Sequence, residues 1–370
     1  MFFNTSRFET NRFSYAFSLG LLSFVLAGIG SILFISDPPI ISITADNTIV
    51  RFSLLTTYIS IVMSLIGYRL LTLEQNKIKQ IEYLGQSQAF KDGLRRFIVS
   101  MAIAWLLTAI CQAVFLLLID TIWVDNLIPR LLMMLLFVLY GGGLGFGVAY
   151  FIVGLDHVEI FWLFVFLAVG GMLFSLTIVQ DTNWWQRSVS ALGIDVGAGF
   201  FFNITIILVG LVALTLARDI LDDLKLLTEL NRFRLSSYDL IRIGLTGASV
   251  GIIGVGLFPT EGLFLSHELH LLSAHVMTLL CVIGMLFLPI IAPDIYPKNF
   301  IYLSRASGII CIVIWLADRF HIISFTAMEL LLFSIFGIWI GIFSEYTKQY
   351  ARRQDPVALT AYALDNNIAI

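Results

Sequence analysis

Charged side chains are scarce in this chain: Asp, Glu, Lys and Arg make up only 13% of its 370 residues, whereas a soluble domain carries about 25%. Apolar residues make up 59%, and the mean hydropathy is +0.93. This composition excludes a water-soluble fold. The net charge is −3 and no block of one sign stands out, so a nucleic-acid partner is not expected.

Cysteine is also rare, and a cleavable leader is not evident. Cys111, Cys281 and Cys311 all lie inside apolar runs, so we interpret them as packing residues and not as a disulfide framework. The apolar run that begins after Ser14 is too long for a signal-peptide core and lacks a small-residue cleavage site before Asp37. We therefore expect it to be a retained first helix.

The chain instead contains ten apolar runs that are long enough to cross a bilayer, which requires about 20 residues. They lie at 14–36, 52–72, 97–119, 131–154, 159–179, 197–217, 239–258, 270–292, 299–317 and 325–345. We predict an all-α polytopic integral membrane protein with about ten transmembrane helices. Residues 1–155 form an N-terminal four-helix part and residues 156–370 a C-terminal six-helix part with a short cytoplasmic tail.

Lys and Arg are unevenly divided between the predicted loops. Ten spans place only Arg51, Arg130, Arg187 and Arg319 on one side, and the other eighteen of the 22 on the side of the termini. Cytoplasmic loops retain positive charge during insertion. Both termini are therefore predicted to be cytoplasmic.

Two segments on the predicted cytoplasmic side, residues 73–93 and 218–237, mix Leu and Ile with charged residues at near-helical spacing. This pattern is typical of a helix that lies in the membrane interface. We interpret both as structural helices that cover the cytoplasmic end of the bundle.

A glycine-rich run at residues 141–147 resembles a phosphate loop only superficially. No Lys-Ser/Thr pair follows it, no strand precedes it, and it lies within a predicted span. Glycines at four-residue spacing let helix backbones approach closely. We predict helix packing there and at Gly247 and Gly251 of the seventh span.

Ionisable residues are nearly absent from the centres of the predicted spans. Arg242, Arg305 and Glu329 lie near span ends, where a long side chain is expected to reach water. This argues against an ion-coupled transporter.

Polar residues concentrate on the predicted outer side of the C-terminal part. From them we select candidate catalytic residues that would hydrogen-bond to a lipid head group or exchange protons with it. These candidates are His270, Glu261, Ser190 and Arg187. Candidate lipid-binding or substrate-binding residues are Trp184, Trp185, Asn203 and Arg319, although paired tryptophans at a membrane boundary also fit an aromatic belt.

A metal site is an alternative for the histidines. On a helix beginning near Ser266, His267 and His270 lie about 60° apart and His275 lies about 80° to the other side of His267. Imidazole suits zinc, and Glu261 or Glu268 could complete a divalent-metal site. Because no His-Glu-x-x-His pattern is present, we favour hydrogen-bonded anchors and leave the cofactor open.

Three segments of the C-terminal half resemble the prokaryotic membrane family of domain of unknown function 998. They are WQRSVSALG at 185–193, FNITIILVG at 202–210, and GLFPT at 256–260 followed by His270. The resemblance covers about residues 159–345 and has no counterpart in residues 1–155. It implies a six-span fold in a prokaryotic plasma membrane and, through a distant similarity to proteins that remodel lipid anchors, a lipid-related role. The matching residues are Ser190, Leu192, Gly193, Asn203, Gly210, Phe258, Pro259 and His270.

Three functions are compatible with these patterns. The first is a lipid-handling or envelope-related protein whose polar site faces the outer leaflet and whose partners are membrane lipids. The second is a small-solute transporter, which predicts repeats and broken helices at mid-membrane. The third is a non-catalytic subunit that binds a membrane-protein partner, or a second copy, through the glycine-lined fourth span. The sequence leaves open whether the protein is an enzyme.

Overall fold

The computed structural model describes residues 16–29, 40–42, 93–95, 97–110, 113, 127–152, 157–260, 264–292 and 295–354. Within them, seven helices are long and apolar enough to cross a membrane. They are Gly93–Ile110, Ile160–Ile178, Gly199–Glu229, Leu235–Leu257, Phe264–Leu288, Lys298–Arg319 and Phe325–Ala351. The predicted span at 52–72 and both termini lie outside the described residues.

The chain forms two compact units. The first contains Met1–Asp156 together with Val169–Thr177, and the second contains His157–Ala168 together with Ile178–Ile370. The helix α5 (His157–Ile178) therefore contributes residues to both units. Each unit is described separately below.

In the first unit, the helix Ala16–Ile29 packs against α4 (Arg130–Ile152) through small residues. A Cβ on Gly142 would lie 3.2 Å from the side chain of Phe24, and a Cβ on Gly145 would overlap Ser23. The prediction of close packing for this glycine-rich run is confirmed at these two positions. At these two positions α4 is covered by the helix Ala16–Ile29, whereas Gly143 of the same run is exposed.

A short antiparallel pairing also belongs to the first unit. The strand β1 (Ile40–Ser42) pairs with β2 (Leu127–Pro129), with Ile41 opposite Ile128. The sequence predicted helices alone, because three residues are too few to show the alternation by which a strand is recognised.

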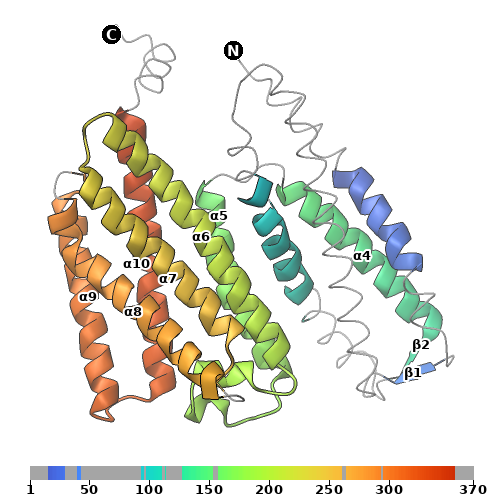
Figure 1. Ribbon diagram of the computed structural model, residues 1–370. Helices are drawn as coiled ribbons and strands as arrows, with labels where there is room; N and C mark the ends of the chain where they lie inside the picture. Colours follow the sequence, from blue (N-terminus) through green and yellow to red (C-terminus); the bar gives the residue numbers. More distant parts are fainter. Residues whose placement is uncertain are drawn as a thin grey trace, which may run out of the picture. The chain divides into compact units, whose positions relative to one another are not determined.

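The second unit is a bundle of antiparallel helices. After α5 come α6 (Gly199–Glu229), α7 (Leu235–Leu257), α8 (Phe264–Ile291), α9 (Lys298–Arg319) and α10 (Phe325–Gln354). Connections alternate between two ends (Figure 1). We call the end with residues 179–198, 258–260 and 320–324 the tryptophan end. The end with residues 230–234, 295–297 and the last turn of α10 is the basic end.

Residues 218–229 do not form the separate interfacial helix that the sequence suggested. They continue α6, whose 31 residues span about 46 Å and exceed a hydrocarbon core of about 30 Å. The apolar face that the pattern identified, including Ile220, Leu224 and Leu227, is buried in the bundle. Helix propensity is continuous through this segment, so the chain does not turn before Asn231, which has a positive φ of 55°.

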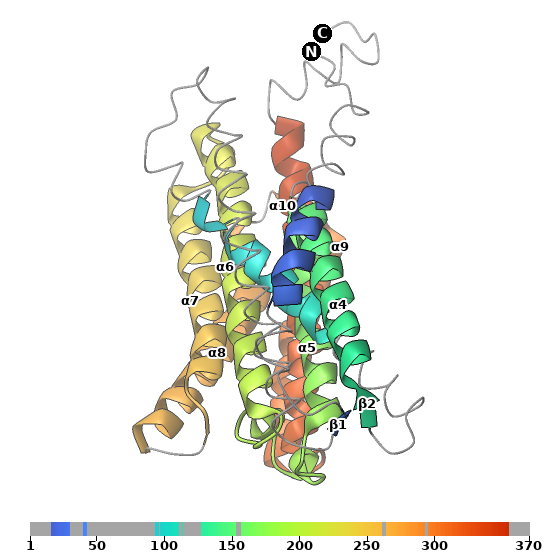
Figure 2. The same cartoon turned by 90° about the vertical axis from the view of Figure 1, so that its right-hand side faces the viewer.

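Five helices of this unit close into a ring. In order, α6 contacts α7, α7 contacts α8, α8 contacts α9, α9 contacts α10, and α10 returns to α6. Figure 2 shows the same helices from the side. The first half of α5 packs on α10, where Phe164 and Phe333 stack with ring centroids 6.4 Å apart.

Glycines set the spacing of α6, α7 and α8 near the tryptophan end. A Cβ on Gly210 or Gly256 would lie 2.8 Å from a backbone atom of the neighbouring helix. A Cβ on Gly251 would lie 2.8 Å from the Ser273 carbonyl oxygen, and one on Gly247 would lie 2.6 Å from Leu280. The packing predicted for Gly247 and Gly251 is therefore confirmed, and α7 approaches α8 here as closely as backbones allow.

A buried hydrogen-bonded relay fixes three helices near the basic end. The Trp339 indole N–H donates to Ser304 Oγ at 2.9 Å, and Ser304 Oγ donates to the Met285 carbonyl at 2.7 Å. Ser304 has no exposed surface. The relay joins α10, α9 and α8, so Ser304 is expected to contribute to stability well beyond its size.

We expect Ser304→Ala to destabilise the protein by about 1–3 kcal/mol, because a buried indole N–H loses its acceptor. The measurement is thermal unfolding in mild detergent. Ser334→Ala is the matched control, since the exposed Ser334 hydroxyl only donates to Leu330 of its own helix. Equal melting temperatures for both variants would contradict the relay's role.

Candidate functional site

The connection between α5 and α6 at the tryptophan end is a compact loop with two 3-10 turns, η2 (Trp184–Gln186) and η3 (Val189–Gly193). Asp195 organises it by accepting hydrogen bonds from four backbone N–H groups. The donors are Gln180, Asp181, Gly197 and Ala198, with shortest distances of 3.1, 2.9, 2.9 and 2.8 Å. Desolvation alone would raise the pKa of Asp195, but these hydrogen bonds outweigh it and lower the pKa below its ordinary value.

Because the folded-state pKa of Asp195 is lowered, its stabilising effect is present above the unfolded pKa of about 3.9 and is lost as pH falls through the folded value. We expect Asp195→Asn to lower the melting temperature at pH 7, and the difference from wild type to shrink below about pH 4. Glu268→Gln, which changes an exposed carboxylate on α8, should show neither effect. A pH-independent difference would contradict the assignment.

The first turns of α10 hold this loop. The Glu329 carboxylate accepts hydrogen bonds from the Val189 backbone N–H and from Ser190 Oγ, the second at 3.4 Å. Thr326 Oγ1 donates to the Trp185 carbonyl at 2.7 Å. From the sequence, Glu329 was expected to lie near a span end and to reach water. In the structure its carboxylate instead points into the loop and bonds to Val189 and Ser190. About 140 residues separate the partners, so no local pattern indicated the contact.

The candidate catalytic residues do not form one site in the described structure. Arg187 is an exposed partner of Asp181, and Ser190 contacts Glu329. His270 lies instead at the turn between α7 and α8, where its Nδ1 is 2.7 Å from the Phe258 carbonyl oxygen. Glu261 lies outside the described residues.

Each of three histidines on α8 bonds a backbone carbonyl. His267 Nδ1 lies 3.0 Å from the Thr260 oxygen and His275 Nδ1 lies 2.6 Å from the Leu271 oxygen, in addition to the His270 contact. A carbonyl only accepts, so Nδ1 carries the proton in each ring. Within the described ranges no group of three or more His, Cys, Asp or Glu could hold a metal ion, and the divalent metal stays a prediction.

The candidate binding residues are also dispersed. Asn203 Nδ2 donates to the Gly193 carbonyl at 2.8 Å, which ties η3 to α6. Trp185 is 53% exposed, as an aromatic belt requires, and Trp184 is half-buried. Arg319 lies over the Trp315 ring, 5.5 Å from its centroid. These four residues hold or flank the tryptophan end, and none of them lines the cavity described below.

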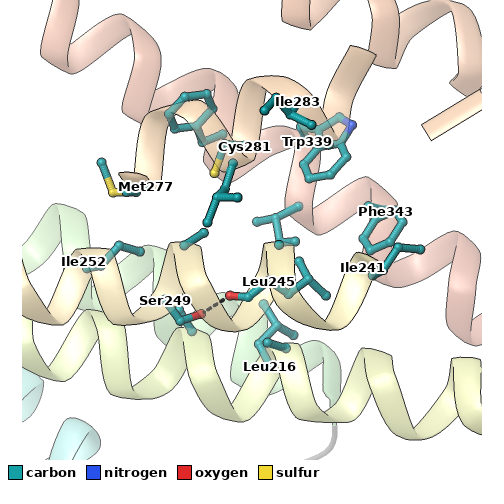
Figure 3. Close-up of a pocket in the computed structure, with 18 of the residues that line it drawn as sticks. Leu216, Ile241, Leu245, Ser249, Ile252, Met277, Cys281, Ile283, Trp339 and Phe343 are labelled. Carbon is teal, nitrogen blue, oxygen red and sulfur yellow. Dashed lines mark hydrogen bonds between the residues drawn. The ribbon is translucent and has the colours of Figure 1, made fainter. Parts of the chain in front are cut away.

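A feature that can hold a ligand was not predicted from the sequence. It is a cavity of about 240 Å³ in the second unit, between α6, α7, α8 and α10 (Figure 3). The described lining is nearly all apolar; it includes Leu216, Ala217, Ile241, Leu245, Ile252, Met277, Leu280, Leu288, Phe336, Ile340 and Phe343. The Ser249 hydroxyl donates to the Leu245 carbonyl at 2.9 Å, and Trp339 is engaged by Ser304.

Missing side chains create this space. No atom lies within 4 Å of where a Cβ would stand on Gly244 of α7 or Gly337 of α10, and the nearest atom to a Cβ on Gly284 of α8 is 3.6 Å away. All three glycines line the cavity. The close contacts of α7 with α8 are at Gly247 and Gly251. Gly244, about one turn nearer the basic end, makes no such contact, and the cavity lies beside it.

The cavity reaches the outside of the bundle. Of its lining residues, Leu240 is 57%, Ile243 61% and Ile283 41% exposed. The first two are on the first half of α7 and the third is on the second half of α8. The opening is therefore apolar and lies in the half of the bundle near the basic end.

Comparisons with known proteins provide no name for this site: no family model, no curated protein and no solved structure matches the chain. The resemblance proposed from the three motifs stays a prediction. In the structure, several of the residues that carry this resemblance stabilise the tryptophan end. Leu192 is fully buried, Asn203 hydrogen-bonds to Gly193, and His270 hydrogen-bonds to Phe258.

Proposed function

We propose that this protein is a lipid-handling multi-pass membrane protein that binds a hydrocarbon chain of a membrane lipid in the cavity between α6, α7, α8 and α10. The observation that carries the proposal is the lining of that cavity. Its described walls have no charged side chain, and the hydroxyl that reaches it is already satisfied within α7.

The chemistry of the walls selects the occupant. A polar solute would lose its hydrogen bonds to water in this cavity and regain few from the walls. Apolar cavities of about 150 Å³ stay dry and take up benzene, and this one is larger. Lipid acyl chains are the most abundant apolar groups around a membrane helix bundle. We therefore favour an acyl chain over the small solute of the transporter hypothesis.

The position of the opening supports lateral uptake. Exposed Leu240, Ile243 and Ile283 lie on helices that are long enough to span the bilayer, so lipid chains contact them directly. In the proposed orientation the basic end is cytoplasmic, in a prokaryotic plasma membrane. This places the opening toward the inner leaflet and leaves the polar residues of the tryptophan end on the outer side, holding loops.

The test is photocrosslinking with a phospholipid that carries a diazirine near the end of one acyl chain, followed by peptide mass spectrometry. Labelling concentrated at cavity residues such as Met277 and Leu280 supports the proposal. Lipid-facing residues of α9, such as Ile309 and Val313, are 55% and 58% exposed and do not line the cavity. Equal labelling of the cavity residues and of these α9 residues would indicate only the lipid that surrounds any membrane protein, and it would overturn the proposal.

A further inference from the structure

We infer that the bound lipid is anionic, with its phosphate at the turn between α6 and α7, beside Arg232 and Arg234. This inference rests on the proposed function, because it assigns the head group of the lipid whose chain occupies the cavity. It is carried by the position of these cations relative to the opening and by their lack of an acidic partner among the described residues.

Arg234 stands in line with the cavity wall. It immediately precedes α7 and lies seven residues before Ile241, a lining residue. Arg234 is the N-cap residue of the helix and has an extended backbone. Seven residues correspond to two helical turns, so Arg234 lies about 10 Å from Ile241 along the helix axis. A chain in the cavity would therefore extend toward Arg234 at its head-group end.

The charge at this turn is unbalanced. Between residues 229 and 243 the chain has three arginines and two acids, Glu229 and Asp239. Glu229 pairs with Lys225 at 3.7 Å. Arg242 pairs with Asp239 at 3.1 Å. Arg232 and Arg234 are exposed, and neither forms an ion pair within the part of the chain that the structure describes. Two cations are thus available to an anion that approaches from the opening.

The described residues at the tryptophan end of this unit include no equivalent pair of unpaired arginines. In the loop of residues 179–198, Arg187 pairs with Asp181, and Asp195 adds a further negative charge. In the last turn of α9, the charges of Asp318 and Arg319 cancel. A negatively charged head group is therefore favoured at the end where the cavity opens. A guanidinium also binds phosphate through paired hydrogen bonds.

The experiment is native mass spectrometry of the full-length protein in mild detergent, titrated with phosphatidylglycerol or phosphatidylcholine carrying identical chains. We expect wild type to bind phosphatidylglycerol about tenfold more tightly, as one charged hydrogen-bond pair implies. A double variant, Arg232→Gln with Arg234→Gln, should lose that preference and keep its affinity for phosphatidylcholine. Arg305→Gln changes an exposed arginine of α9 that does not line the cavity, and it should match wild type.

The outcomes separate this inference from the proposed function. Equal affinity of wild type for the two lipids, or a preference that survives in the double variant, overturns the anionic head-group site. The proposed function stands in either case if Gly337→Leu removes the binding of both lipids. If Gly337→Leu leaves both affinities unchanged, the cavity itself is not the binding site and both conclusions fail.

Discussion

Replacing Gly337 by Leu is expected to abolish binding of a lipid chain while the bundle stays folded. Gly337 lines the cavity. A Cβ there meets nothing from neighbouring helices within 4 Å, so a new side chain has open space at its base. Glycine in a helix interior costs about 1 kcal/mol relative to better helix formers, and filling an apolar void adds contacts. Stability should therefore rise while lipid binding is lost, which a misfolded variant cannot reproduce.

The two quantities are measured on the same sample: bound lipid by native mass spectrometry and the melting temperature by thermal unfolding in mild detergent. Gly143→Leu is the matched control, because Gly143 also has open space at its Cβ position but belongs to α4 in the first unit. Unchanged lipid binding in Gly337→Leu would contradict the prediction. So would an equal loss in the control, since that would indicate a nonspecific effect.

Truncating Glu329 to Ala is expected to release the loop at the tryptophan end. The carboxylate accepts from the Val189 N–H and from Ser190 Oγ, and removing it leaves partly buried donors without a partner. That loss costs about 1–3 kcal/mol. Faster hydrogen exchange across residues 184–193, together with a lower melting temperature, would show the release.

Two further variants make this prediction specific to the contact. Glu329→Gln keeps a carbonyl oxygen that can accept from Val189, so it should restore much of the protection. Glu345→Ala removes an exposed carboxylate of the same helix, whose partner Gln349 is one turn away, and should leave exchange in the loop unchanged. Equal exchange in Glu329→Ala and wild type would show that the remaining contacts, such as Thr326 to Trp185, hold the loop alone.

Much of the helical organisation could be predicted from the sequence, because span length and apolarity are local properties. The predicted spans at 239–258 and 299–317 coincide with α7 and α9 within a few residues. The seven helices that are apolar enough to cross a membrane all overlap predicted spans. The helix-packing role of Gly145, Gly247 and Gly251 was also predictable, since four-residue spacing in an apolar run has few other uses.

The interpretation of the polar residues was less successful, because their partners are distant in sequence. Arg187, Ser190 and His270 were grouped as one site on the assumption that residues at one membrane boundary converge. The structure engages Ser190 with Glu329 and His270 with Phe258. Neither contact follows from periodicity, since each depends on which helices are neighbours in the ring.

The sequence by itself determined that this is a protein of a membrane and where along the chain its helices lie. Both follow from the number of consecutive apolar residues. The cavity was decided only by tertiary structure. Gly244, Gly284 and Gly337 resemble the packing glycines in sequence, yet they leave space where those make contact. Whether a glycine makes contact or leaves space depends on which atoms of the neighbouring helices lie opposite it, and this is a property of how whole helices pack.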